Sequence, residues 1–241
     1  MKQRWISGMV AAMCLTMSSA FADEASVRNA FMAKYPKANV ESIKRLPELG
    51  LYEIVIPRAD EPLVIYTDEE FRFMAQGSLV DTKTMIDVAE KTRNRLSAID
   101  FDSLPLDRAI KKVKGKGERR LVVFSDADCP FCKRLEEEMK GLDNVTVYTF
   151  LFPIDQLHPE AARKSRQIWC SADKVKTWND WMQRDVTPKG AGSCNTDALT
   201  ANLDFAKKYR ITGTPTLVFE GGQRVPGAIN AQQIEELLAK N

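Results

Sequence analysis

The chain has 241 residues, of which 44% are hydrophobic and 28% are charged, so it can bury ordinary hydrophobic cores and is not a miniprotein built on disulfides. Lys and Arg number 35 against 33 Asp and Glu, and two of these bases but none of the acids lie in the first 22 residues, which leaves 33 of each sign in the rest. Nucleic-acid binding needs a basic patch, and nothing in this charge balance suggests one, so no nucleic-acid partner is expected.

The start of the chain has the pattern of a secretory signal peptide. Lys2 and Arg4 are followed by an apolar stretch from Ile6 to Met17 and then by Ala20-Phe21-Ala22. This order of a basic start, an apolar stretch and an Ala-x-Ala site predicts that the first 22 residues are removed and that the mature chain begins at Asp23. The apolar stretch is shorter than the about 20 residues that span a bilayer, so we expect no stable membrane insertion.

Residues 23–83 have the pattern of a small α+β domain. Helical spacing of apolar residues up to Pro36 predicts a helix, and a change to alternating or continuous apolar runs predicts strands after it. The strands are expected at 52–56, 63–67 and 71–74. A sheet of so few strands has a thin core and open edges, which must be blunted or paired. This pattern favours self-association, and the alternative is a self-contained accessory domain.

Residues 84–102 have the pattern of a helical connector between two domains. Thr84 and Asp87 stand at the spacing of a capping box, and no glycine interrupts the apolar side that follows. We expect a semi-rigid helix that ends near Asp102. A second short helix is expected to start at Ser103, with an apolar stripe formed by Leu106, Ala109, Ile110 and Val113.

A Cys-x-x-Cys pair begins a helix directly after a buried strand. The apolar run 121–124 predicts the strand, and the pattern at 134–140 predicts the helix. A sulfur at a helix N-terminus faces unpaired backbone N–H groups and the positive end of the helix dipole, so its pKa falls. Cys129 is therefore predicted to be a nucleophile. Cys132, about one turn later, can close a disulfide with it or resolve a mixed disulfide.

The cysteine pair has two other interpretations. A zinc site would need a second closely spaced pair, and Cys170 and Cys194 are far apart, so no metal is predicted. A purely structural disulfide is less favoured, because a strand-to-helix junction is a poor place for an inert bond. If Cys129 pairs with Cys132, then Cys170 and Cys194 are either paired with each other or both free. An oxidising compartment favours the pair, which would be structural.

A strand at 144–151 precedes a helical insertion at about 155–210. Aromatic side chains recur at helical spacing in the insertion, among them Trp178 and Trp181, and are expected to belong to the core. The only histidine, His158, has no acid near it in the sequence. We therefore expect a structural role for it rather than a Cys–His protease site.

The segment 211–219 contains a proline at the entry of a buried strand. Pro215 cannot donate to a sheet ladder, and a cis peptide bond before it would expose the backbone of Thr214 to a partner. The sequence of this segment by itself leaves the isomer open. Gly221-Gly222 predicts a hairpin turn, and Asn230 is expected to cap a closing helix.

The order of these elements is strand, Cys-Pro-Phe-Cys helix, strand, helical insertion, Thr-Pro, hairpin and helix. It resembles the thioredoxin fold, and in more detail the DsbC/DsbG family of bacterial periplasmic disulfide isomerases. The similarity covers nearly the whole mature chain. The resemblance implies an α+β N-terminal dimerisation domain at 23–83, a linker helix at 84–102, and an α/β thioredoxin-like catalytic domain at 103–241 that contains the helical insertion.

The resemblance also implies roles for particular residues. Cys129 looks like the exposed nucleophile and Cys132 like the resolving thiol, with Cys170 and Cys194 as the structural disulfide. Pro215 looks like the cis-proline that faces the motif, and Thr214 looks like the residue that offers backbone hydrogen bonds to an extended substrate. The implied partners are misoxidised exported proteins, a membrane reductase of the DsbD type and a second copy of the chain. The implied location is the periplasm, and no cofactor is implied.

The motif departs from the family pattern in two respects. Pro130 and Phe131 differ from the Cys-Gly-Tyr-Cys that is common in DsbC and are closer to the Cys-Pro-Tyr-Cys of DsbG, so the balance between isomerase and reductase stays open. Thioredoxin has a buried acid six residues before its first cysteine, and this chain has Val123 there. Asp126 and Asp128 lie nearby but are expected to be solvated, so no group is assigned to the proton of the second cysteine.

The function predicted from the sequence is that of a disulfide isomerase. Cys129 would attack an incorrect disulfide, and Cys132 would release reduced substrate when rearrangement stalls. One alternative is a DsbG-like reductase that protects single cysteines from sulfenic acid damage. An alternative of another class is a holdase chaperone that binds unfolded chains in a dimer cleft.

Overall fold

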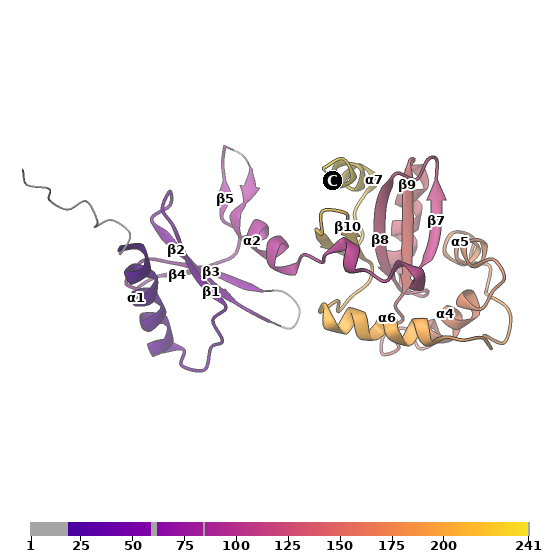
Figure 1. The fold of residues 1–241 in the computed structure, drawn as a ribbon, viewed down its shortest axis with the longest axis horizontal. Coiled ribbons are helices and arrows are strands. Elements are labelled where there is room, and N and C mark those ends of the chain that lie inside the picture. Colours follow the sequence, from indigo (N-terminus) through magenta and orange to yellow (C-terminus); the bar gives the residue numbers. More distant parts are fainter. Residues whose placement is uncertain (1–18, 59–61, 84, 241) are drawn as a thin grey trace, which may run out of the picture. The chain divides into compact units, whose positions relative to one another are not determined.

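The computed structural model describes residues 19–58, 62–83 and 85–240, and most of the predicted signal peptide lies outside these ranges. The described residues form two compact units that divide between Ala89 and Glu90. Figure 1 shows the order of the elements along the chain. No helix within the described ranges is long and apolar enough to cross a membrane.

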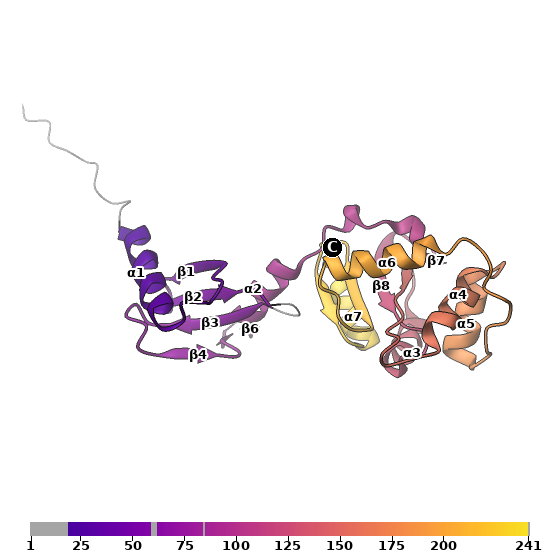
Figure 2. The ribbon, with the colours of Figure 1, turned by 90° about the horizontal axis from the view of Figure 1, so that it is seen from below.

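The first unit is a helix packed on a four-stranded antiparallel sheet with the strand order β1-β2-β3-β4 (Figure 2). Val27 and Phe31 of the helix are buried against Tyr52, Ile54 and Ile65 of the two central strands. The helix expected up to Pro36 and the strands expected at 52–56 and 63–67 are confirmed. The elements are α1 Ser19–Lys34, β1 Ser42–Leu46, β2 Leu51–Ile56, β3 Leu63–Thr67 and β4 Met74–Gln76.

The last strand of this sheet starts later than predicted, because a turn occupies the residues before it. Phe71 has a φ of 51°, in the left-handed region. The carboxylate of Asp68 accepts the backbone N–H groups of Arg72 at 2.7 Å and Phe73 at 3.1 Å, which closes the turn. The strand expected to start at Phe71 therefore begins only at Met74.

The connector helix is also shorter than predicted. A two-stranded ribbon of β5 Val80–Asp81 and β6 Ile86–Asp87 precedes it, and α2 runs only over Val88–Ser97. Thr84 lies outside the described residues. Asp87 accepts the backbone N–H groups of Leu79 at 3.2 Å and Ala89 at 2.9 Å, so it joins the ribbon to the start of α2. The prediction of a single helix over 84–102 is therefore wrong at both ends.

The second unit is built on a five-stranded sheet with the order β11-β10-β8-β9-β7, in which only β8 and β9 are parallel. Its strands are β7 Ile110–Lys114, β8 Arg119–Ser125, β9 Val145–Leu151, β10 Thr216–Phe219 and β11 Arg224–Pro226. Its helices are α3 Pro130–Glu138, α4 Ala161–Trp169, α5 Lys174–Arg184, α6 Asp197–Lys208 and α7 Ala231–Leu238. Short 3-10 turns lie at Phe101–Ser103, Leu106–Arg108 and Met139–Gly141.

Helices cover both faces of this sheet. Leu121 and Val123 of β8 pack with side chains of α3 and α7 on one face, and Val122 and Phe124 pack with α6 on the other. All four side chains are at most 1% exposed. A strand buried on both faces has a continuous apolar run, which is why the sequence indicated this strand clearly. A third cluster joins the insertion helices α4 and α5 to the Cys-x-x-Cys segment.

The second helix predicted after Ser103 is wrong. Two short 3-10 turns are followed by strand β7, which pairs antiparallel with β9. Ile110 is 2% exposed and Val113 is 54% exposed, so the expected stripe does not lie on one buried face. Pairing with a strand more than 30 residues away overrides the local helical spacing. The lysines of β7 suit the edge of a sheet, where charged side chains prevent further pairing.

The predictions for the end of the chain are confirmed. β10 and β11 form an antiparallel hairpin around Gly221-Gly222. Gly222 has a φ of 81°, and a Cβ there would lie 2.9 Å from the carbonyl oxygen of Ile99, so this turn requires glycine. Asn230 caps α7 in a capping box with Gln233.

Candidate active site

The Cys-x-x-Cys pair lies at the N-terminus of α3, shortly after the end of strand β8, as the sequence predicts. Cys129 is the N-cap residue and Pro130 occupies the first turn of the helix, where the missing N–H of a proline costs nothing. Both motif cysteines are free thiols. The helix therefore presents unpaired N–H groups to the sulfur of Cys129.

The surroundings of Cys129 favour its thiolate. A hydrogen bond from the thiol of Cys132 is the main cause that lowers the pKa of Cys129 from 9.0 to about 5, and burial opposes it. The Thr214 side chain and the backbone N–H groups of Phe131 and Cys132 lower this pKa further. Cys129 Sγ also lies 3.4 Å from the carbonyl oxygen of Thr214, which can accept from the thiol but cannot bind the thiolate.

The second cysteine is held in the opposite state. Cys132 is 1% exposed, and its burial raises the pKa of this thiol strongly, with the neighbouring Cys129 adding to the effect. The Ser125 side chain and the backbone of Asp126 lower the pKa only in part. The pair thus consists of one sulfur that is anionic at neutral pH and one that keeps its proton. The anionic sulfur can attack a disulfide, and the protonated one can act only after the first has reacted.

A loop from a distant part of the chain lies against the first cysteine. The Thr214–Pro215 peptide bond is cis, and the carbonyl of Thr214 contacts Cys129 across 85 residues of sequence. Phe131, one of the two middle residues of the motif, is 60% exposed beside this site. The Thr-Pro segment and the motif therefore meet in the fold, as the resemblance implies.

Cys170 and Cys194 form a disulfide with an S–S distance of 2.02 Å. This is one of the two states that the sequence left open. The bond joins the end of α4 to the loop before α6, and so it closes the outer part of the insertion. Among the residues that the structure describes, no group of three or more His, Cys, Asp and Glu side chains is placed to share a metal ion.

Two expectations about exposure are wrong. Cys129 is only 4% exposed, because the Thr214 segment and the insertion cover it. Asp126 is fully buried rather than solvated, and Asp128 keeps only 15% of its side chain exposed. The sequence suggested solvated acids because these residues lie in a short polar loop. The fold covers that loop with the helical insertion.

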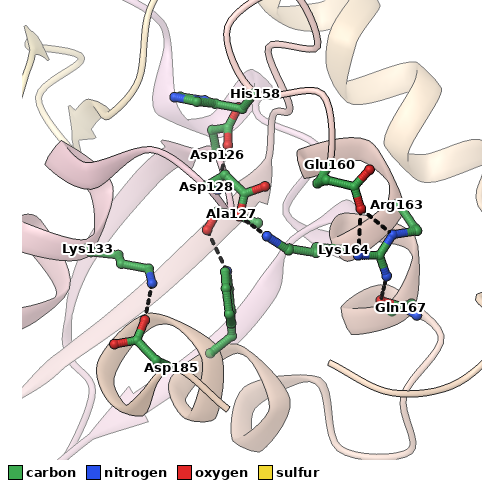
Figure 3. A network of polar contacts seen from close by, with 11 residues as sticks. Asp126, Ala127, Asp128, Lys133, His158, Glu160, Arg163, Lys164, Gln167 and Asp185 are labelled. Carbon is green, nitrogen blue, oxygen red and sulfur yellow. Dashed lines mark hydrogen bonds and ion pairs between the residues drawn. The ribbon is translucent and has the colours of Figure 1, made fainter. Parts of the chain in front are cut away.

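The buried carboxylate of Asp126 joins the motif loop to the segment after β9. It accepts the backbone N–H of Asp128 and that of Ile154, both at 2.7 Å. His158 Nδ1 lies 3.1 Å from the same carboxylate, at ion-pair distance but outside hydrogen-bond geometry, and the two side chains are neighbours in Figure 3. His158 therefore packs against Asp126, and the structural role expected for it stays a prediction.

Sequence reasoning missed Asp126 and Trp181 as residues that hold the motif loop. The spacing Asp-x-Asp directly after a strand could have indicated the first, since an Asp side chain often accepts the N–H two residues on. Nothing in the sequence indicates that the Trp181 indole N–H donates to the carbonyl of Ala127, at 2.5 Å. A sheet of this topology that holds one reactive and one protonated sulfur at a helix N-terminus defines a thioredoxin-like disulfide oxidoreductase.

Comparisons with known proteins agree with this class. A model of a thioredoxin-like domain matches residues 106–241, and a model of the disulfide bond isomerase protein N-terminal domain matches residues 18–90. The probable thiol:disulfide interchange protein DsbC of Bordetella parapertussis is 38% identical over 213 residues, which are 88% of this chain and 73% of that protein. The thiol:disulfide interchange protein DsbC of Escherichia coli K12 is 25% identical over 235 residues, which are 94% of each.

A solved structure is also similar. The crystal structure of a disulfide interchange protein from Neisseria gonorrhoeae has 44% sequence identity and a TM-score of 0.55, and the match covers 57% of this chain and 98% of that one. The chain belongs to the DsbC family of thiol:disulfide interchange proteins. It is a disulfide oxidoreductase or isomerase.

Proposed function

We propose that the chain is a periplasmic disulfide isomerase that rearranges or reduces incorrect disulfides of exported proteins, with Cys129 as nucleophile and Cys132 as resolving thiol. The observation that carries this proposal is the placement of the two free thiols, with Cys129 as the N-cap of α3 and Cys132 buried one turn later. A hydrogen bond from Cys132, helped by the backbone N–H groups at the start of α3, lowers the pKa of Cys129 to about 5, and burial raises the pKa of Cys132. Family membership and the secretory pattern of the first residues support the location.

The reaction begins when the thiolate of Cys129 attacks one sulfur of a substrate disulfide. A new S–S bond forms to that sulfur, and the other substrate sulfur leaves as a thiolate. This thiolate can attack another disulfide of the substrate. When a substrate thiolate finally displaces Cys129, the disulfides have been rearranged without net oxidation or reduction. If rearrangement stalls, Cys132 loses its proton and attacks Cys129. The substrate then leaves with two more electrons, and the enzyme holds a Cys129–Cys132 disulfide.

We further propose that Thr214 and Pro215 bind the substrate chain beside the nucleophile. The Thr214 carbonyl lies 3.4 Å from Cys129 Sγ, so a polypeptide that pairs with this backbone would pass over the sulfur. The exposed ring of Phe131 adds an apolar contact next to it. Because the mechanism requires free thiols in an oxidising compartment, we include a membrane reductase of the DsbD type as the partner that restores them.

Reactivation of scrambled ribonuclease tests the assignment of the two cysteines. Cys129→Ser should abolish reactivation, because serine at this pH is not a nucleophile toward disulfides. Cys132→Ser is the matched control: it should keep some rearrangement but accumulate mixed disulfides that only added thiol releases. Full activity of Cys129→Ser would contradict the proposal. A second assay offers the wild type a sulfenylated protein beside scrambled ribonuclease. It compares the reductase and isomerase activities directly.

We also propose that the chain forms a homodimer through its first unit. β4 is an edge strand; Phe73, directly before it, is 71% exposed, and Met74, its first residue, is 49% exposed. Exposed apolar residues on an open edge favour pairing with a second chain. Light scattering should give twice the chain mass for the mature protein, and Phe73→Asp should lower it. Leu49→Asp, at an exposed apolar residue in the β1–β2 turn, should leave the mass unchanged; a monomeric wild type would rule the dimer out.

A further inference from the structure

The indole of Trp181, on helix α5, contacts the chain on both sides of Cys129. Its Nε1 donates to the carbonyl of Ala127, two residues before the nucleophile, at 2.5 Å. Nζ of Lys133, four residues after the nucleophile, lies over the indole ring at 4.2 Å from its centroid, in a cation–π contact. Ala127 is fully buried, so solvent does not replace the indole as donor to this segment.

A second lysine ties the same ring to the residue next to Cys129. Nζ of Lys164, on α4, lies 4.3 Å from the centroid of Trp181 and 2.5 Å from the carboxylate of Asp128. The side chains of this ion pair are only 14% and 15% exposed, so the pair is weakly screened by solvent. Figure 3 shows Lys164 reaching Asp128 and Lys133 reaching Asp185.

Each of the three residues before the nucleophile is therefore held from outside the motif. Asp126 is held by the N–H of Ile154, Ala127 by Trp181, and Asp128 by Lys164. Two of these three contacts involve Trp181, directly or through a lysine on its ring. The same ring also contacts the first turn of α3 through Lys133, so the loop and the helix on either side of Cys129 are fixed against one aromatic side chain.

We propose that Trp181 is a positioning residue for Cys129, which holds its sulfur in register with the N–H groups at the start of α3 and with Thr214. The inference rests on the proposed role of Cys129 as nucleophile. The single N–H of the indole is used by Ala127, so Trp181 acts through the backbone and the helix rather than by donating to sulfur. If the N-cap residue Cys129 were displaced, all the hydrogen bonds that stabilise its thiolate would weaken together.

The chain offers a matched control in the same insertion. Trp169, at the end of α4, donates its Nε1 to the carbonyl of Asn195 at 3.1 Å and has Nζ of Lys174 over its ring at 3.3 Å. It thus makes the same two kinds of contact as Trp181, but its partners lie outside the motif. Trp169→Phe and Trp181→Phe each remove one N–H donor and keep an aromatic ring, so they differ mainly in whether the lost contact reaches the loop before Cys129.

The experiment measures the titration of Cys129 in the reduced mature protein by thiolate absorbance and by the rate of alkylation with iodoacetamide. For Trp181→Phe we expect the pKa of Cys129 to rise by about one, which corresponds to losing roughly one charge-assisted hydrogen bond, and alkylation at pH 5 to slow by about fivefold. Trp169→Phe should keep the wild-type titration. Both variants should unfold cooperatively with similar losses of melting temperature.

Three outcomes would overturn the proposal. They are an unchanged titration in Trp181→Phe, an equal change in both variants, and the loss of cooperative unfolding in Trp181→Phe alone, which would make the tryptophan a general folding residue. Failure of the proposed function looks different. In that case Cys129 of the wild type would titrate near its ordinary pKa. The Cys129→Ser variant would keep full isomerase activity.

Discussion

The stability of the reduced protein should rise with pH because of a single sulfur. Donors around Cys129 lower its pKa from 9.0 to about 5, so between these values the unfolded chain binds a proton that the folded chain does not. Stability then increases by about 1.4 kcal/mol for each pH unit in this window. At pH 7 the contribution is about 2 to 3 kcal/mol, and it is lost as the pH falls through 5. Cys132 does not oppose it there, because a raised pKa acts only above the ordinary range.

Urea unfolding of the reduced wild type and of Cys129→Ala between pH 5 and 8 measures this contribution. The difference in unfolding free energy should grow with pH, and absorbance of the thiolate should give a midpoint near 5. The oxidised wild type is a second control, because a disulfide does not titrate and its stability should lack this slope. A pH-independent difference, or a thiolate midpoint near 9, would refute the account of the thiolate given above.

Three further variants test how the second unit is stabilised. Replacing both Cys170 and Cys194 by Ala should lower the unfolding free energy by about 3 kcal/mol, since the bond closes a separation of 24 residues, while the alkylation rate of Cys129 stays unchanged; a changed rate would give the bond a role beyond structure. Asp126→Ala leaves two backbone donors without their acceptor and should cost about 2 to 4 kcal/mol in urea unfolding, and a loss below 1 kcal/mol would contradict its bridging role. Asn230→Ala removes a helix cap and should cost about 1 kcal/mol in the same assay, with no change expected for the exposed Gln232→Ala.

The reactive segment was predictable because its signals are local. A run of apolar residues from Leu121 to Phe124, a helix-start proline and a cysteine before it determine the strand, the turn and the N-cap without help from the rest of the chain. The same holds for the capping box of α7. The opposite case is β7, in which helical spacing from Leu106 to Val113 gave the wrong element because the deciding contact is a ladder with β9.

The parts of the site that the sequence did not predict are those made by distant segments. Asp126 was expected to be solvated, and it is buried because the loop after β9 and the insertion close over it. The cis bond before Pro215 and its approach to Cys129 were expected only through a family resemblance. Local periodicity cannot indicate contacts of this kind, since they join residues 28 to 85 positions apart that share no pattern.

The burial of Cys129 is compatible with its reactivity. A thiolate in an apolar site would be unfavourable, and burial does raise the pKa of this sulfur, but several short-range donors outweigh it. Part of its cover comes from the carbonyl side of Thr214, a neighbour that can bind the thiol and cannot bind the thiolate. Ionisation therefore weakens the contact that covers the sulfur and strengthens its bonds to the helix N-terminus. The Thr214 side chain, which lowers the pKa of Cys129, still favours the charged, attacking form, so only the carbonyl contact is lost on ionisation.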